Sequence, residues 1–345
     1  SWALVCHERD VAEPGQYFTA EIAGEPVIIL RDAEGRLRAL SNVCRHRASA
    51  LLRGSGRCEK VIRCPYHGWS YHQDGRLAGA AEARGFTGLQ PAEFSLPSFP
   101  VGTLGGFVFA ALDPGIEPLE TWFGDLAERL APFRFGELVR GAPGATEHPQ
   151  NWKVVADNFL EGYHVPIGHP GLFRLLDYKK YRTTPGRHYS WVDAPLRDAP
   201  SKQWAERIYQ RLGRARSGYP IEFARSWNYV HLWPATFLNI YPEMMDVWQL
   251  QPSGVRFTRA VSVGFQPAGA PLRDRVLIRL NDLLNNWVQL EDNVLCEGVQ
   301  RGLEGRTYTR GILNRCENGV LHFHDMLRSA LPELDEAAAQ VTRSA

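Results

Sequence analysis

Residues 44–67 of the chain read CRHRASALLRGSGRCEKVIRCPYH. The stretch contains two short motifs, C-x-H at Cys44 and His46 and C-x-x-H at Cys64 and His67. Each motif combines one cysteine thiolate with one histidine imidazole, and both groups are common ligands of transition metals. The stretch therefore predicts a metal centre that is held by two loops, each of which supplies one sulfur and one nitrogen.

Two kinds of metal centre use two cysteines and two histidines. One is tetrahedral zinc, and the other is a Rieske 2Fe–2S cluster, in which two histidines replace two cysteines on one iron. Zinc fingers place both cysteines in one half of the motif and both histidines in the other half, whereas here each half is mixed. Small and aromatic residues such as Gly68, Trp69 and Tyr71 could shield a buried cluster. The mixed order favours the Rieske cluster, and structural zinc remains the alternative.

A second candidate metal motif lies downstream, where residues 157–169 read DNFLEGYHVPIGH. We expect a helix over residues 152–164, and on a straight continuation of it His169 would lie about 140° around from His164. Pro166 disfavours such a continuation, so we expect a break that brings the two histidines to one metal. The alternative is a helix that merely ends at Pro166, with two histidines on the surface.

In this order, the two motifs resemble those of the Rieske non-haem iron oxygenases, and the resemblance extends from about residue 2 to about residue 328. It implies a Rieske 2Fe–2S cluster bound by Cys44, His46, Cys64 and His67. It also implies a mononuclear Fe(II) ion, which this family binds with two histidines and one carboxylate on one face, leaving positions open for oxygen and substrate. In this chain the two histidines are His164 and His169.

The third iron ligand implied by the resemblance is a carboxylate in the segment 290–293, which reads LEDN. Both Glu291 and Asp292 lie in a predicted helix, and both have apolar neighbours one turn away, so amphipathicity does not distinguish them. Asp292 is favoured because the family ligand is usually an aspartate. A surface helix with two solvated acids is the alternative.

The resemblance also implies three candidate catalytic residues near His164. On the predicted helix, Glu161 shares a face with His164. In the family an acid at this position links the Rieske histidine of one subunit to the iron-binding histidine of its neighbour; aspartate is usual, and glutamate occurs in some members that act on quaternary ammonium compounds. Asn158 and Tyr163 match positions near the iron, where they would support its ligands.

The pattern of strands and helices indicates an α+β protein with two domains. The resemblance implies a small all-β Rieske domain over residues 1–112. It further implies a helix-grip (START-like) catalytic domain with an antiparallel sheet over residues 113–345. Hydrophobic periodicity predicts helices over 117–140, 152–164 and 277–303, and strands over 26–30, 37–40, 106–110, 237–241, 247–251 and 258–265. The segment from about 185 to 220 is rich in Pro, Arg and Gly, and we expect it to be irregular.

The composition is that of an ordinary globular protein. Lys plus Arg number 39 and Asp plus Glu number 38, so the net charge of +1 gives no reason to expect nucleic acid or a membrane as a partner. No apolar stretch is long enough to span a bilayer, and no signal peptide is visible. The six cysteines form no disulfide framework, which fits a reducing cytoplasm. No glycine-rich nucleotide fingerprint follows a predicted strand, so electrons from NAD(P)H and a flavin would arrive through a partner reductase or a ferredoxin.

The resemblance implies the terminal oxygenase component of a Rieske oxygenase system. Such a protein uses O2 to hydroxylate or oxidatively demethylate a small organic substrate, here a quaternary amine or an aromatic acid. A ring cis-dihydroxylating dioxygenase shares the same iron site and is the first alternative. A non-catalytic Rieske electron-transfer protein is an alternative of another class, and it would lack the second metal motif. A homotrimer is expected, because family members pass electrons to a neighbour's iron and a closed ring satisfies that head-to-tail need.

An alternating run in the second domain is a candidate substrate wall. Trp227, Tyr229, His231 and Trp233 would share one face of a strand. Aromatic faces there could hold a quaternary ammonium group by cation–π attraction or stack on an aromatic ring. Ordinary core packing is the alternative.

Two further histidines, His322 and His324, lie two residues apart in a predicted helix. Residues at that spacing do not face each other on a helix, so we interpret them as structural.

Overall fold

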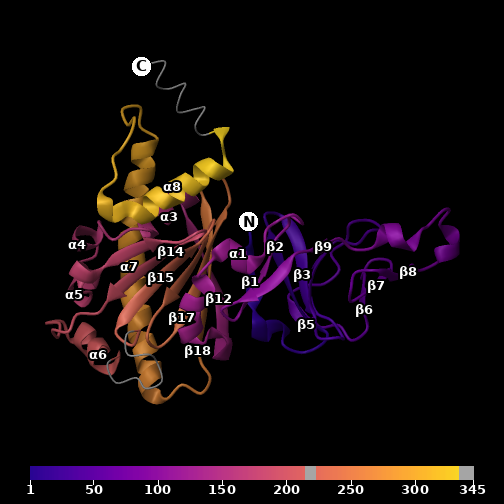
Figure 1. Ribbon diagram of the computed structural model, residues 1–345, viewed down its shortest axis with the longest axis horizontal. Coiled ribbons are helices and arrows are strands. Elements are labelled where there is room, and N and C mark those ends of the chain that lie inside the picture. Colours follow the sequence, from indigo (N-terminus) through magenta and orange to yellow (C-terminus); the bar gives the residue numbers. More distant parts are fainter. Residues whose placement is uncertain (214–222, 334–345) are drawn as a thin grey trace. The chain divides into compact units, whose positions relative to one another are not determined.

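The computed structural model describes residues 1–213 and 223–333 of the 345-residue chain (Figure 1). These residues form two compact units. The first contains Ser1–Trp122 and Ala127–Glu137, and the second contains Phe123–Leu126 and the chain from Leu138 onward. A division between domains at residues 112 and 113 remains a prediction.

The first unit is built from short antiparallel strands, as the sequence predicts. Its described residues form a five-stranded sheet of order β5-β2-β3-β4-β9 and two three-stranded sheets of order β1-β11-β10 and β6-β7-β8. The strands are β1 (Ala3–His7), β2 (Gln16–Ile22), β3 (Glu25–Arg31), β4 (Leu37–Ser41), β5 (Ser55–Arg57), β6 (Val61–Arg63), β7 (Ser70–His72), β8 (Leu77–Gly79), β9 (Ser98–Phe99), β10 (Val101–Leu104) and β11 (Phe107–Ala110). The predicted hairpin of β3 and β4 and the predicted strand β11 are therefore confirmed.

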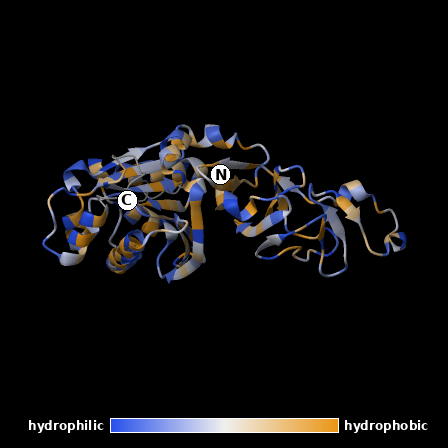
Figure 2. Ribbon diagram, turned by 90° about the horizontal axis from the view of Figure 1, so that it is seen from below, coloured by the Kyte–Doolittle hydropathy of each residue, from blue (hydrophilic) through white to orange (hydrophobic). Residues whose placement is uncertain are grey.

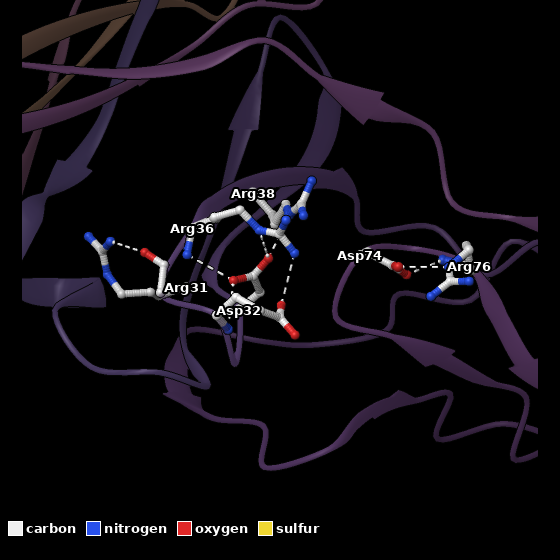
Figure 3. Close-up of polar contacts among 8 residues, drawn as sticks. Arg31, Asp32, Arg36, Arg38, Asp74 and Arg76 are labelled. Atoms are coloured by element: carbon white, nitrogen blue, oxygen red, sulfur yellow. Dashed lines mark hydrogen bonds and ion pairs between the residues drawn. The ribbon is translucent and has the colours of Figure 1, made fainter.

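A buried carboxylate fixes the turn between β3 and β4. The side chain of Asp32 is 2% exposed, and it accepts hydrogen bonds from the Nε atoms of Arg36 at 3.1 Å and Arg38 at 2.9 Å (Figure 3). Burial alone would raise the pKa of Asp32, but these bonds and one from the Arg36 backbone hold the pKa below its ordinary value. The turn between β7 and β8 carries a more exposed pair of the same kind, Asp74 with Arg76 at 2.7 Å.

The described residues of the second unit form one seven-stranded antiparallel sheet with helices. The strand order is β12-β18-β17-β16-β15-β14-β13, and the strands are β12 (Leu138–His148), β13 (Arg182–Pro185), β14 (Tyr189–Pro195), β15 (Ser226–Leu232), β16 (Thr236–Ile240), β17 (Met245–Pro252) and β18 (Thr258–Pro267). The helices are α3 (Trp152–Phe159), α4 (Val165–Gly168), α5 (Pro170–Leu175), α6 (Trp204–Gly213), α7 (Leu272–Leu303) and α8 (Asn318–Ala330). The long helix α7 runs along the sheet and packs with α3, α4, α5 and α6 (Figure 1).

Most predicted elements of the second unit are confirmed. The strands expected over 237–241, 247–251 and 258–265 correspond to β16, β17 and β18, and the helix expected over 277–303 is α7, which begins at Leu272. Apolar and polar residues are mixed along the strands and helices of both units (Figure 2). The α+β class is confirmed, with an antiparallel sheet wrapped by helices in the second unit. The first unit has antiparallel sheets, but it also contains most of two short helices, Leu119–Phe123 and Leu126–Leu130.

Three predicted elements are wrong in part. The expected helix over 117–140 is two short helices, α1 (Leu119–Phe123) and α2 (Leu126–Leu130), because Gly124 takes a left-handed φ of 60° and Arg134 one of 52°. The segment 185–220 holds regular structure, namely β14 and α6, and its residues 214–220 lie outside the described part of the chain. Tertiary pairing overrode its turn-rich composition.

The expected helix over 152–164 ends at Phe159. Glu161 is the reason, because its carboxylate accepts hydrogen bonds from the backbone N–H groups of Tyr163 and His164. These bonds fix a turn and replace the bonds that a further helical turn would make. Glu161 and His164 therefore lie in a turn and do not share a helix face.

No helix in residues 1–213 and 223–333 has the length and hydrophobicity that crossing a lipid bilayer would require.

Candidate metal centres and the adjoining cavity

Two loops of the first unit present the predicted thiolates and imidazoles, and the loops share one backbone pattern. The N–H of Ala48 donates to the carbonyl of Cys44 at 3.0 Å, and the N–H of Gly68 donates to the carbonyl of Cys64 at 3.1 Å. Both donors have a left-handed φ, 56° at Ala48 and 70° at Gly68. In each loop the cysteine N–H also donates to the carbonyl five residues on, that of Ser49 or of Trp69. Each loop therefore folds back on its own cysteine and projects the histidine beside it.

The four side chains converge, and one of their metal-binding atoms has no other partner. The thiols of Cys44 and Cys64 are buried, and the rings of His46 and His67 meet edge-on with centroids 4.7 Å apart. Trp69 stacks on His46 at 5.0 Å. Within the described residues, the buried Nδ1 atom of His46 has no hydrogen-bond partner. A buried nitrogen without a partner is what an absent metal ion leaves, so the donor set fits a 2Fe–2S cluster.

The protonation of this site also suits metal binding. Burial alone would raise the pKa of Cys64, but hydrogen bonds from the backbone of His67 and Tyr66 lower it below its ordinary value. Burial lowers the pKa of His67, and the neighbouring His46 and Arg47 lower it further. A thiolate and a neutral imidazole are the forms that bind a metal.

Tyr71 adds a contact that the sequence did not reveal. Its hydroxyl lies 3.3 Å from Sγ of Cys44 and accepts a hydrogen bond from the Arg45 N–H at 3.0 Å. Burial raises the pKa of Tyr71, so the hydroxyl keeps its proton and can donate it to the sulfur. Hydrogen bonds to the sulfurs are one of the features that set the potential of such clusters. Tyr71 is visible in the sequence near the C-x-x-H motif, but the sequence gives no indication of where its hydroxyl points.

The second set of predicted ligands lies on either side of a single helical turn. His164 directly precedes α4, and His169 directly follows it. The N–H of His169 donates to the carbonyl of Val165, the first residue of α4. This turn brings the two imidazole centroids to 5.0 Å from each other. The two histidines come together as predicted, but the predicted position of the break is wrong: Pro166 lies within α4, and the helical path is interrupted between α3 and α4 and again at His169, between α4 and α5.

A carboxylate from α7 completes the cluster. Oδ1 of Asp292 lies 2.8 Å from Nε2 of His169 and 3.8 Å from Nε2 of His164. All three ligand atoms lie within 4.8 Å of one another. Two imidazoles and one carboxylate on one face are the donor set of non-haem ferrous sites. The geometry fits a divalent ion, and the role of these residues as iron ligands remains a prediction.

Each histidine of the cluster has a glutamate behind it. Nδ1 of His164 contacts the carboxylate of Glu161, and Nδ1 of His169 lies 2.7 Å from Oε2 of Glu291. With Nδ1 bonded to a carboxylate, Nε2 of each ring is directed at the third residue, Asp292. The sequence offered Glu291 only as an alternative ligand, because residue spacing cannot tell which side of a histidine an acid will face.

Charge favours a cation in this cluster. Burial lowers the pKa of His169, but hydrogen bonds and attraction from Asp292 and Glu291 outweigh burial and raise the pKa above its ordinary value. A bound metal ion replaces that proton as the positive charge between the acids.

The remaining predicted site residues have different places. Asn158 donates from Nδ2 to Oδ1 of Asp292 at 2.6 Å, so it does support the carboxylate of the cluster. The side chain of Tyr163 is 56% exposed, and Tyr163 does not line the cavity described below. His324 lies 3.0 Å from Asp157 and ties α8 to α3, in agreement with a structural role.

A cavity of about 1130 Å³ adjoins the site formed by His164, His169 and Asp292. The helix α7 and the strands β12, β15, β16, β17 and β18 supply most of its lining, and His164, His169 and Asp292 line it as well. Of the four residues expected to form an aromatic wall, only Tyr229 lines the cavity; Trp227 and His231 are buried among other aromatic rings. The cavity draws its other aromatic residues from separate segments, and these are Phe159, Tyr181, Tyr241 and Trp248.

Comparison with known families agrees with this geometry. Residues 1–100 match the Rieske [2Fe-2S] domain. Residues 135–333, more than half of the chain, match the ring hydroxylating alpha subunit (catalytic domain). The protein belongs to the Rieske non-haem iron oxygenases. Its cofactors are therefore a Rieske 2Fe–2S cluster and a non-haem iron.

This oxygenase has relatives along almost its whole length. It is 33% identical to the choline monooxygenase, chloroplastic, of Beta vulgaris over 341 residues, which is 96% of this chain and 72% of the relative. It is 32% identical to the carnitine monooxygenase oxygenase subunit of Acinetobacter pittii, over 89% of this chain and 80% of the relative.

Solved structures show the same fold. A quaternary ammonium Rieske monooxygenase, described for carnitine oxidation and inter-subunit electron transfer, aligns with a TM-score of 0.80 and 29% identity, over 95% of this chain and 88% of the other. Naphthalene 1,2-dioxygenase of Rhodococcus sp. aligns with a TM-score of 0.72 and 21% identity, over 94% of this chain and 87% of the other, which is a likeness of fold alone.

Proposed function

We propose that this protein is the terminal oxygenase of a system that monooxygenates a small quaternary ammonium compound, by hydroxylation or oxidative demethylation. The observation that carries the proposal is an aromatic-lined cavity that adjoins the His164, His169 and Asp292 cluster and contains acidic side chains. Relatives named for choline and carnitine support the same substrate class.

The proposed ligands divide between the two units. Cys44, His46, Cys64 and His67 would hold the 2Fe–2S cluster, and His164, His169 and Asp292 would hold the mononuclear iron. When bound, the cluster would supply electrons and the iron would supply activation of O2 for attack on a C–H bond. The protein supplies position: Glu161 and Glu291 orient the two imidazoles, and Asn158 orients the carboxylate of Asp292.

Aromatic side chains give the cavity a wall suited to an alkylammonium group. The ring of Phe159 lies 5.7 Å from that of Tyr229 and 6.5 Å from that of Trp248, so the three form one continuous surface. Phe159 follows directly on Asn158, which contacts Asp292. Methyl groups on a cationic nitrogen gain from aromatic faces both by dispersion and by cation–π attraction. The same wall excludes water from the neighbourhood of the proposed mononuclear iron site.

Electrons are proposed to reach this protein from a partner reductase or ferredoxin, and to pass between copies of the chain in a homotrimer. The inter-subunit electron transfer named for a structural relative supports this arrangement. Exposed side chains that recur every three or four residues on α7, namely Leu283, Trp287, Leu290 and Val294, offer a surface for another subunit. Six cysteines without a disulfide are consistent with a cytoplasmic location.

A single-turnover experiment tests the substrate class without the native reductase. The chemically reduced holoenzyme is exposed to O2 in the presence of choline, carnitine, γ-butyrobetaine, benzoate or naphthalene. We expect substrate-dependent oxidation of the cluster and a product with one added oxygen atom, or a demethylated product, only with the quaternary amines. Conversion restricted to the aromatic compounds, or formation of a cis-diol, would overturn the proposal.

A further inference from the structure

We propose that Asp246 is the residue that recognises the positive charge of the substrate, and that it makes this cavity selective for cations over neutral compounds of the same shape. The inference rests on the proposed function and adds to it a specific carboxylate. It concerns a residue that contacts neither histidine of the metal cluster.

Asp246 lies in a row of residues that crosses the sheet and faces the cavity. Tyr229 on β15 pairs with Asn239 on β16, Asn239 pairs with Asp246 on β17, and Asp246 pairs with Gly264 on β18. All four residues line the cavity. Gly264 contributes no side chain, so space is left on one side of the carboxylate, while Tyr229 lies two strands away on the other.

The carboxylate of Asp246 lacks a positively charged partner in the described chain. Its one hydrogen bond comes from Nδ2 of Asn239 at 2.7 Å, and no arginine or lysine among these residues forms an ion pair with it. Burial therefore raises its pKa to about 7, against the Asn239 bond and with a small contribution from Asp282. Asp246 is half-buried on the cavity wall, and an acid in such a place without a counter-ion is costly, which suggests that the counter-ion is a ligand.

A neighbouring acid shows what a structural carboxylate looks like in this fold. Glu243 is fully buried, but it accepts hydrogen bonds from the Tyr209 hydroxyl at 3.0 Å and from Nδ2 of Asn281 at 2.6 Å. It does not line the cavity. Asp246, in contrast, keeps acceptor capacity directed at open space.

The surroundings of Asp246 suit an alkylammonium group. Burial raises the pKa of Tyr241, and the charge of Asp246 raises it further, so this ring is close to the carboxylate. Burial also raises the pKa of Tyr229, and the nearby Tyr181, Asp292 and Asp246 raise the same pKa by smaller amounts. The ring of Tyr229 lies 6.4 Å from that of Tyr241, and both residues line the cavity with Asp246. A cation held by Asp246 would therefore lie in the same cavity as the three proposed iron ligands.

The other charged groups of the cavity do not neutralise Asp246. Arg279 on α7 is 84% exposed and lies 3.7 Å from Asp282, which places it at the rim. Elsewhere the lining carries the acids Glu147, Glu161 and Asp292 and the histidines His148, His164 and His169. The cavity interior is therefore biased towards a positive ligand.

The main test is Asp246→Asn, which keeps the shape and removes the charge. The holoenzyme is assayed with choline and with its neutral isostere 3,3-dimethylbutan-1-ol, and kcat and KM are measured for both. We expect the KM for choline to rise by at least about tenfold, with less than a threefold change for the isostere. The matched control, Glu243→Gln, should lower the melting temperature and leave the ratio of the two KM values unchanged.

Stability gives a readout that a structural role would not produce. Without ligand, Asp246→Asn should melt higher than the wild type at pH 8, because the folded wild type carries an unpaired carboxylate there. Since folding raises the pKa of Asp246 from about 3.8 to about 7, the difference should become smaller as the pH is lowered towards 5. A variant that melts lower at pH 8 would contradict the inference.

The wild-type protein supplies a second test that needs no variant. Binding of choline should be about tenfold weaker at pH 6 than at pH 8, because the carboxylate must lose a proton to bind the cation. The isostere controls for titration of the cavity histidines and should show no such change. If choline is bound or converted and neither Asp246→Asn nor pH changes its preference over the isostere, the role of Asp246 is wrong and the proposed function stands. If the wild type neither binds nor converts any quaternary amine, both are wrong.

Discussion

The two metal centres of this protein are assembled in opposite ways. All four proposed cluster ligands lie within residues 44–67, on two loops that repeat one backbone pattern. The mononuclear site joins His164 and His169 to a carboxylate that lies 123 positions beyond His169. The first site is a local structure that two hairpin loops can form, whereas the second depends on the packing of α7 against α4 and α5.

The two centres also differ in what positions their ligands before a metal binds. Two buried thiols and an imidazole nitrogen without a partner leave the first site dependent on its metal cluster. In the second site both histidines have carboxylates behind them, so orientation is supplied by Glu161 and Glu291 before any metal binds. We therefore expect loss of a ligand to abolish either centre, and graded losses only from changes to the two glutamates that orient the histidines of the second.

The largest effect is expected at the proposed 2Fe–2S cluster. Cys44→Ser or Cys64→Ser should abolish the visible absorption of the purified protein and all turnover, because a thiolate ligand is lost. Cys58→Ser is the matched control: Cys58 is also buried in this unit, but its thiol donates to the Val61 carbonyl at 2.9 Å, a bond that serine can keep. Retained cluster spectra after either of the first two changes would overturn the ligand assignment.

Removing a ligand of the second site should leave the first site intact. His164→Ala, His169→Ala or Asp292→Asn should keep the colour and the cluster iron, while mononuclear iron and turnover fall to background, since a three-ligand site cannot spare a ligand. Iron analysis after chelation, together with the visible spectrum, measures both centres in one sample. Loss of the colour in these variants would show that the centres are not independent.

Glu161→Gln should separate electron transfer from metal binding. At saturating iron both metals should stay bound and the 2Fe–2S cluster should still accept electrons, but oxidation of the reduced cluster by O2 and substrate should slow by at least about 100-fold, because the charge that would join two imidazoles is gone. Asp157→Asn is the control, since this acid on α3 pairs with His324 and contacts neither histidine of the site. A near wild-type single-turnover rate in Glu161→Gln would end the bridging hypothesis.

The smallest effect is expected at the carboxylate behind His169. Glu291→Gln should weaken mononuclear iron binding by about 10- to 100-fold and leave measurable turnover at saturating iron, because it removes orientation and not a ligand. Glu297→Gln, on the exposed part of α7, should be silent. If Glu291→Gln removes iron as fully as Asp292→Asn does, then Glu291 is the ligand and the two acids exchange roles.

The sequence by itself determined the parts of this protein that depend on local order. The mixed C-x-H and C-x-x-H motifs, the pair of histidines five positions apart, and the hairpin of β3 and β4 all follow from neighbouring residues and their backbone preferences. The long helix α7 and the strands β16, β17 and β18 follow from periodicity for the same reason.

Only the tertiary structure decided which side chains meet. Amphipathicity could not separate Glu291 from Asp292, and packing of α7 places one behind His169 and the other in front of it. Helix α3 ends earlier than the periodicity predicts, because the carboxylate of Glu161 accepts hydrogen bonds from the backbone of the next turn. The aromatic residues of the cavity came from five segments and not from one strand, and Asp246 entered the cavity through the register of β17 with its neighbours. Contacts between distant segments depend on register and packing, and a single sequence does not encode these in any local pattern.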